Sequence, residues 1–197
     1  MGRKRVIDQQ DVLDAAERVV ARDGAARLTL DAVAIEAGIS KASVLYDYKS
    51  KQALIAAVVE RAVAADNQFN QAVTAGLGDV ANAAVRGRIV AAANPLPEDF
   101  RPVALNLCAA LAQDSALRKV IQQNQSAVID RIMSSSVNPR GALLAYLALE
   151  GLKLLEALDY HNWPQAERDR ILREINWLAD MAPNDGTALP QARVPDA

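Results

Sequence analysis

The stretch Thr29–Lys51 constrains the fold of this chain more than any other. Thr29, Ser40 and Ser50 can each accept a backbone N–H through the side-chain oxygen, so each can cap the start of a helix. Gly38 can adopt the left-handed conformation that ends a helix, which places a tight turn before Ser40. The stretch therefore predicts two short helices joined by a turn and followed by a third helix. This is the pattern of a helix-turn-helix, whose second helix lies in the major groove of DNA.

The second of these helices, over residues 40–48, is predicted to have an inner and an outer side. At helical periodicity Val44 and Tyr48 face inward. The side chains predicted to face solvent are Lys41, Ala42, Ser43, Tyr46 and Asp47.

The residues of this stretch resemble the TetR family of bacterial transcriptional regulators. The family's usual motif is T-x-x-x-(I/V)-A-x-x-A-G-V-S-x-(G/P)-(T/S)-(L/I)-Y-x-(H/Y)-F-x-(S/N)-K. The chain matches this motif at Thr29, Val33, Ala34, Ala37, Gly38, Ser40, Ser43, Ser50 and Lys51. Conservative changes occur at Ile39, Val44 and Tyr48, and departures at Ala42, Leu45 and Asp47. The motif-level resemblance covers residues 8–60 and implies DNA binding.

The predicted outer side of the second helix carries the candidates for base contact. Lys41 can donate to guanine O6 or N7, and Ala42 can contact a thymine methyl group. The resemblance implies that Ser43 and Lys51 hold phosphates. Tyr46 either bonds a phosphate, stacks on a sugar or only braces the helix. The full set of expected DNA-binding residues is Thr29, Lys41, Ala42, Ser43, Leu45, Tyr46, Lys49 and Lys51.

Two departures from the family motif bear on DNA binding. Leu45 stands where the family usually has a tyrosine that often bonds phosphate, so this contact is lost. Asp47 repels phosphate unless it accepts from cytosine N4 or pairs with Lys49 or Arg27, and we expect the pairing. These departures keep an alternative function open, that of an all-helical ligand-binding or interaction protein with weak or lost DNA binding.

The charge of the chain is unevenly distributed. The formal net charge is −2, yet residues 1–51 carry nine Lys and Arg against eight Asp and Glu. Phosphate binding needs only a local positive face. Arg3, Lys4 and Arg5 can form an arm along phosphates or into the minor groove, and a frayed terminus is the alternative.

Composition excludes several classes of protein. The 197 residues contain no apolar run of the ~20 residues that a membrane span needs. The N-terminus lacks the apolar centre of a signal peptide, and Cys108 is the only cysteine, so we expect a cytoplasmic protein without disulfide or metal site. His161 is the only histidine and no nucleophile is marked near it, so we expect neither catalysis nor a cofactor.

The predicted fold is all-α. We expect a helix-turn-helix DNA-binding domain over residues 1–52, a helical ligand-binding and dimerisation domain over 53–182, and a disordered tail over 183–197. The first helix is predicted to begin after Asp8 and the fourth to run from Lys51 to about Val73. The later helices are predicted over residues 79–93, 97–113, 115–134, 139–160 and 164–182.

The segment Gly141–Tyr160 is apolar on nearly every side of its predicted helix, and the next helix has a broad apolar face. A helix of this kind must pack against more than one partner. Two helices from each of two chains can form a four-helix bundle, and the resemblance implies this homodimer; burial within a monomer is the alternative. The expected interface residues are Leu147, Gly151, Leu154, Leu155, Leu158, Ile171, Ile175 and Leu178.

Polar residues within the apolar segments are candidates for contact with a small molecule. The expected pocket residues are Asn106, Cys108, Gln122, Tyr146 and Glu150. The function predicted from the resemblance is that of a ligand-responsive transcriptional regulator, a repressor that binds a palindromic operator in double-stranded DNA as a homodimer. An unknown small molecule is expected to release it.

Overall fold

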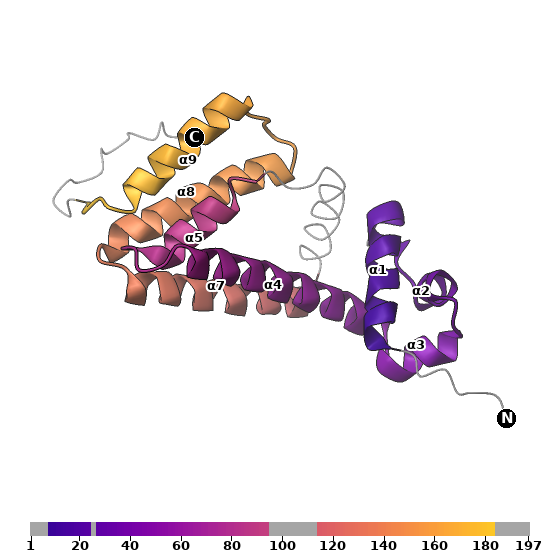
Figure 1. Cartoon of the computed structure of the whole chain (residues 1–197). Coiled ribbons are helices and arrows are strands. Elements are labelled where there is room, and N and C mark those ends of the chain that lie inside the picture. The colour runs from indigo at the N-terminus through magenta and orange to yellow at the C-terminus, as the bar shows by residue number, and fades with distance from the viewer. Residues whose placement is uncertain (1–7, 25–26, 95–113, 184–197) are drawn as a thin grey trace, which may run out of the picture.

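The computed structural model describes residues 8–24, 27–94 and 114–183 of the chain, and within these ranges every regular element is a helix (Figure 1). This confirms the predicted all-α class. The predicted helix over 97–113 and residues 184–197 of the expected tail lie outside the described residues. The helices are α1 (Gln9–Asp23), α2 (Leu30–Ala37), α3 (Lys41–Asp47), α4 (Lys51–Gly76), α5 (Ala83–Ala91), α7 (Ser115–Ser135), α8 (Pro139–Ala157) and α9 (Gln165–Leu178).

The predicted caps form α2, α3 and α4. Thr29, Ser40 and Ser50 have extended backbones, and their hydroxyl oxygens accept at 3.0 to 3.1 Å. The donors are the backbone N–H groups of Ala32, Ser43 and Ala53. Gly38 ends α2 at a φ of 67°, a left-handed conformation that costs glycine little. The helix-turn-helix is thus fixed by local hydrogen bonds at each of its corners.

The three N-terminal helices and the start of α4 share one hydrophobic core, which we call the head (Figure 1). Its fully buried residues include Val19, Leu28, Val44 and Leu54. Leu117, from the distant helix α7, is also buried in this core, with 3% of its surface exposed. The start of α7 is therefore packed against the head.

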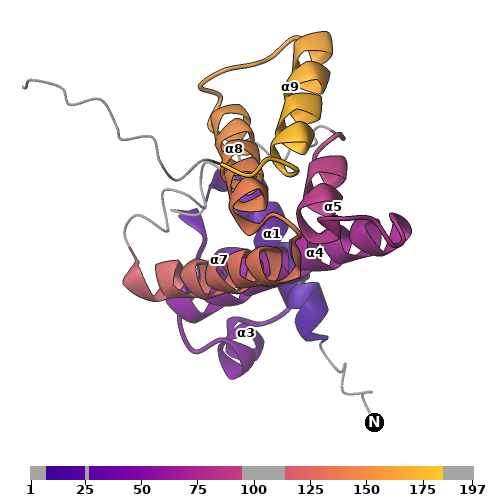
Figure 2. The same cartoon turned by 90° about the vertical axis from the view of Figure 1, so that its left-hand side faces the viewer.

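The helices α5, α7, α8 and α9 enclose a second core, which we call the body (Figure 2). Val85, Ile132 and Leu149 lie at its centre. The rod-like helix α4 runs from the head to the body, where it contacts α5 and α7. The expected domain boundary between residues 52 and 53 falls in the first turn of α4, whose Leu54 still belongs to the core of the head.

Helix α5 begins at residue 83 and not at the predicted 79, because Asn82 has a left-handed backbone with a φ of 59°. Its buried side chain accepts from the backbone N–H of Val137 at 2.9 Å and donates to the carbonyl of Ala179 at 3.0 Å. One amide thus joins the start of α5, the turn before α8 and the end of α9. These bonds stabilise a backbone that residues other than glycine rarely adopt.

Helices α4 and α5 approach each other closely at Gly87. A Cβ atom on this residue would lie 1.9 Å from Oγ1 of Thr74 and 2.9 Å from its Cα. Only glycine fits this crossing without displacing the backbone of α4. Within the described ranges, no helix combines the length and the apolar character needed to cross a membrane.

Candidate DNA interface and ligand cavities

Helix α3 lies on the outside of the head with its second half anchored in the core. Val44 is fully buried and Tyr48 packs against the same core, as predicted. Lys41, Ala42 and Tyr46 are exposed, and 80% of the surface of Tyr46 is accessible. Of the other expected DNA-binding residues, Thr29 and Lys49 are exposed, and Ser43, Leu45 and Lys51 are half-buried. The expected arm of Arg3, Lys4 and Arg5 lies outside the described residues.

Two of the exposed lysines have partners within the head. The ammonium group of Lys41 lies 2.8 Å from Oδ2 of Asp31, in the first turn of α2. Lys49 donates to the backbone carbonyl of Tyr46 at 2.7 Å, and its Nζ lies 5.3 Å from the centre of the Tyr46 ring. Lys41 at the start of α3 and Tyr46 with Lys49 near its end thus place cationic and aromatic groups along the exposed side of this helix.

The expected pairing of Asp47 with Lys49 or Arg27 is wrong. Oδ1 of Asp47 accepts from Nε2 of Gln9 at 3.2 Å, and Gln9 is the first residue of α1. Lys49 turns back to the carbonyl of Tyr46. The fold brings the start of α1, where Gln9 lies, to the end of α3.

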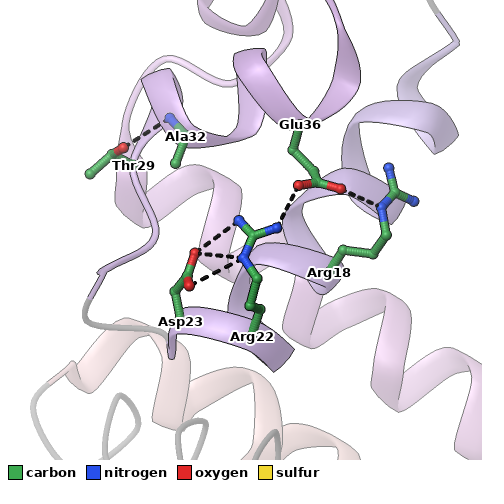
Figure 3. Close-up of polar contacts among 6 residues, drawn as sticks. All are labelled: Arg18, Arg22, Asp23, Thr29, Ala32 and Glu36. Carbon is green, nitrogen blue, oxygen red and sulfur yellow. Dashed lines mark hydrogen bonds and ion pairs between the residues drawn. The ribbon is translucent and has the colours of Figure 1, made fainter.

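Ion pairs between α1 and α2 hold the helix-turn-helix in place (Figure 3). Glu36 of α2 accepts from Arg18 and from Arg22 of α1, each at 2.8 Å, and Arg22 also contacts Asp23 at 2.9 Å. The hydrogen bond from Arg18, followed by that from Arg22, lowers the pKa of Glu36. The hydrogen bond from Arg22 lowers the pKa of Asp23 as well. No local sequence pattern predicts the pairing across α1 and α2, because Arg22 and Arg18 lie 14 and 18 residues from Glu36.

The outer surface of α8 carries an apolar stripe. Its members recur at helical spacing and are Leu144, Leu147, Gly151, Leu154 and Leu155, all exposed. Of the other residues expected at a dimer interface, Leu158, Ile171 and Leu178 are half-buried. Ile175 is only 4% exposed and belongs to the core of the body, so it cannot face a partner chain. Trp177 of α9, which is not among the expected interface residues, is 57% exposed.

Two cavities lie between α4 and the body. The first has a volume of about 170 Å³ and is lined by Asn67, Asn70, Gln71, Thr74, Ala84, Arg88, Asn124, Ala127, Val128, Arg131 and Ile132. The second, of about 330 Å³, is lined by Asp66, Phe69, Asn70, Arg88, Ala91, Ala92, Asn94, Lys153, Glu156 and Arg168. Asn70 and Arg88 line both cavities and stand between them.

None of the expected pocket residues that the structure describes lines either cavity. Gln122 is exposed on α7, and Glu150 pairs with Lys153 at 3.1 Å. Tyr146 is buried and donates its hydroxyl hydrogen to Gln125; burial raises its pKa to about 12. Asn106 and Cys108 lie outside the described residues.

The first cavity corresponds to a polar pattern in the sequence of α4. Asn67, Asn70, Gln71 and Thr74 recur at the spacing of one helix face, on the side of α4 that meets α5 and α7. Polar residues on an inward face are unusual, and they indicate a wetted or ligand-binding site.

Models of known protein families match both parts of the chain. Residues 12–58 match the model described as "Bacterial regulatory proteins, tetR family". Residues 78–180, just over half of the chain, match that described as "Tetracyclin repressor-like, C-terminal domain".

The chain belongs to the TetR family.

Solved structures of TetR-family proteins have the same fold. A regulator named as a TetR-family member from Rhodococcus sp. is 19% identical, with a TM-score of 0.68 over 87% of this chain and 98% of the other. A TetR-family member from Streptomyces coelicolor is 20% identical, with a TM-score of 0.63 over 86% and 96%. The multidrug binding protein EbrR, solved in complex with malachite green, is 22% identical, with a TM-score of 0.66 over 88% and 98%. No curated protein matches the chain.

The family assignment identifies the domain of the TetR family to which each part of the structure corresponds. The head is the helix-turn-helix part of a TetR-family transcriptional regulator, and the body corresponds to the C-terminal domain of the family. The TetR-family motif thus correctly indicated the family and the fold of the chain.

Proposed function

We propose that this TetR-family protein is a ligand-responsive repressor that binds a palindromic operator as a homodimer and is released from it by a small molecule. We further propose the division into a DNA-binding domain over residues 1–52 and a ligand-binding and dimerisation domain over 53–182. No catalytic role is proposed for any residue. The observation that carries the proposal is helix α3, on which Lys41 and Tyr46 are exposed while Val44 is buried in the core of the head.

The surface of α3 supports DNA binding. Lys41, Ala42 and Tyr46 are exposed on one short helix, while Val44 anchors the opposite side in the core. A helix supported in this way can enter the major groove without losing its packing. Lys49 and Lys51 follow directly and add positive charge beside the start of α4, where free N–H groups also favour a phosphate.

The stripe on α8 supports a homodimer. Leu147, Leu154 and Leu155 are 54%, 52% and 38% exposed and lie on one side of the helix. Exposed apolar stripes of this kind mark interaction surfaces in soluble proteins. In a twofold dimer the α8 helices of the two chains pack against each other, and the two heads are then held at one separation, as a palindrome requires.

The cavities support release by a ligand. The first cavity is walled by α4, α5 and α7. Helix α4 continues into the head, and Leu117 and Ile121 of α7 pack against the core of the head. A molecule that prefers a different spacing of α4 and α7 therefore moves the head. It can shift the equilibrium by no more than its difference in affinity between the two states.

The experiment that tests this proposal is selection of genomic DNA fragments by the purified protein, followed by gel shifts on the retained sequences. We expect a palindromic sequence that shifts at nanomolar protein, with a steep dependence on salt. The double variant Lys41→Ala/Tyr46→Ala should fold and lose the shift. The salt slope reports the number of phosphate contacts.

The alternative function, a helical ligand-binding protein with weak or lost DNA binding, predicts a different result. Its support is the pairing of Lys41 with Asp31, which occupies a lysine expected to contact bases, and the half-buried Leu45. In that case no sequence is enriched, and any shift is equal on random DNA. Such a result refutes the repressor.

A further inference from the structure

The walls of the first cavity have an unusual composition. Two arginines, Arg88 and Arg131, face a space whose other polar lining comes from side-chain amides and from the hydroxyl of Thr74. Among the described residues that line it, none is an aspartate or a glutamate. The cavity therefore offers positive charge and hydrogen-bond donors without a carboxylate of its own.

Arg88 is the central residue of this cavity. Its side chain is 12% exposed, and its Nη2 donates to Oδ1 of Asn67 at 3.2 Å. Its Nη1 lies 3.7 Å from Oδ2 of Asp66, which is too far for a hydrogen bond. A guanidinium has five N–H donors, whereas this long ion pair and the bond to Asn67 are the polar contacts of Arg88 with described residues. Arg88 thus retains capacity for an anion.

Neighbouring side chains fix the position of Arg88. The ring of Tyr146 lies 5.9 Å from its Cζ, and Asn67, its hydrogen-bond acceptor, donates in turn to Oδ1 of Asn124 at 2.7 Å. These contacts join α5, α4 and α7 in one polar chain. Arg131 follows Asn124 by two turns of α7, is exposed, and forms no ion pair with any described residue.

The second cavity is less suited to an anion. Asp66 and Glu156 line it and supply negative charge. Its most buried cation, Arg168, is already satisfied by Glu156 at 2.7 Å and by the carbonyl of Ala92 at 2.8 Å. Of the two cavities, only the first therefore offers arginines without an aspartate or glutamate among the described residues of its lining.

We propose that the first cavity binds a small organic anion, whose carboxylate or phosphate oxygens accept from Arg88 and Arg131. Arginine binds both head groups through paired N–H donors. The volume of about 170 Å³ is below the ~300 Å³ at which drug-sized pockets begin, so the ligand is small. This inference rests on the proposed function, because it names the class of molecule that releases the DNA.

The experiment uses the full-length protein without DNA and three probes of one shape. Benzoate, benzamide and benzamidinium share a ring and differ in charge, and their binding is measured by ligand-detected NMR and calorimetry. We expect benzoate to bind at least tenfold more tightly than the neutral and the cationic probe. Phenyl phosphate, run in parallel, shows whether carboxylate or phosphate is the better head group.

Substitutions then test the site. Arg88→Gln should weaken benzoate binding about tenfold or more, and Arg131→Gln should weaken it less. Arg173→Gln is the matched control, because Arg173 is exposed on α9 and lines neither cavity. If Arg88→Gln does not fold by circular dichroism, Arg88→Lys serves instead and should keep the preference for benzoate over benzamide at lower affinity.

Several results would overturn the anion site. They are equal binding of the three probes, tighter binding of benzamidinium, no binding of either anion up to the millimolar range, or unchanged benzoate binding in a folded Arg88→Gln variant. Gel shifts with operator DNA in the presence of the anion test separately whether anion binding releases the DNA. Anion binding through Arg88 without release of operator DNA leaves the anion site standing and refutes only its role as the signal.

Discussion

The ammonium group of Lys41 and the carboxylate of Asp31 lie 2.8 Å apart, joining the first residue of α3 to the first turn of α2. Both side chains are at least half exposed, so the pair stabilises the fold by only about 0 to 1 kcal/mol. The pair matters more for binding, because Asp31 competes with a base for the N–H donors of Lys41 and places a negative charge beside it. We therefore expect the pair to lower the affinity of the head for DNA.

The first prediction is that Asp31→Asn strengthens DNA binding. The change removes a negative charge beside the expected groove-facing surface and frees Lys41, so affinity for operator and random DNA should both rise. The salt slope should become steeper by about one charge. Fluorescence anisotropy over a range of salt measures this. Asp11→Asn, an equal change of charge in the exposed first turn of α1, is the control.

The second prediction separates base contact from phosphate contact. Lys41→Ala should weaken operator binding selectively, by about 1–3 kcal/mol, and relax the sequence preference. Lys51→Ala should weaken binding to all DNA alike and flatten the salt slope. Competition between operator and random DNA measures both. Equal losses on the two DNAs from both substitutions would refute the assignment.

The third prediction concerns stability in acid. The pKa of Glu36 in the folded state is below its usual value, so unfolding takes up a proton there. The ion pairs of Glu36 therefore contribute stability above about pH 4.3, the unfolded value, and lose it as the pH falls through the folded pKa. Glu36→Gln should lower the Tm at pH 7 and flatten its fall in acid.

Thermal unfolding by circular dichroism from pH 7 to pH 3 checks the effect of Glu36→Gln. Glu174→Gln provides the matched control, because Glu174 forms a single exposed pair with Arg170 at 3.0 Å within one helix. This control should leave the Tm nearly unchanged. Equal curves for the two variants would show that the α1–α2 ion pairs do not stabilise the head.

The fourth prediction tests the dimer. Leu154→Asp or Leu155→Lys places a charge in the apolar stripe on α8, at its C-terminal end, and should yield folded monomers. Analytical ultracentrifugation measures the mass. Val137→Lys is the control, because Val137 is 72% exposed in the turn before α8 and away from the stripe. A stripe variant with unchanged helicity and unchanged sedimentation would contradict the interface.

The fifth prediction concerns the crossing of α4 and α5. Gly87→Ala forces a Cβ against Thr74 and its backbone, and overpacking of this kind costs about 1–3 kcal/mol. Urea unfolding measures the loss. Gly76→Ala is the control, because its Cβ would meet no atom within 4 Å. Equal stability of the two variants would mean that α4 and α5 can move apart to admit the methyl group without a loss in the free energy of unfolding.

Local features of this fold were predictable from the sequence, and distant contacts were not. The caps at Thr29, Ser40 and Ser50 were correct because each depends on a hydrogen bond three residues away. Ile175 could not be assigned by pattern, since an apolar residue on a helix looks the same in the core of its own chain as at an interface.

The candidate site shows the same difference between local features, which the sequence predicts, and distant contacts, which it does not. The exposed side of α3 followed from the spacing of Val44 and its neighbours. The bond from Gln9 to Asp47 joins residues 38 positions apart, and no local rule predicts it. The cavity around Arg88 forms where three helices meet, so its arginines could be recognised only once the packing was known.

The burial of Leu117 among the N-terminal helices has a consequence for protein engineering. A fragment that stops at the end of α4 lacks this side chain and keeps a hole where it packed. Transplanting residues 8–76 onto the effector module of another regulator should therefore fail unless the recipient supplies an equivalent leucine. The unit that can be exchanged between regulators is thus discontinuous in sequence, because it includes the start of α7 together with the N-terminal helices.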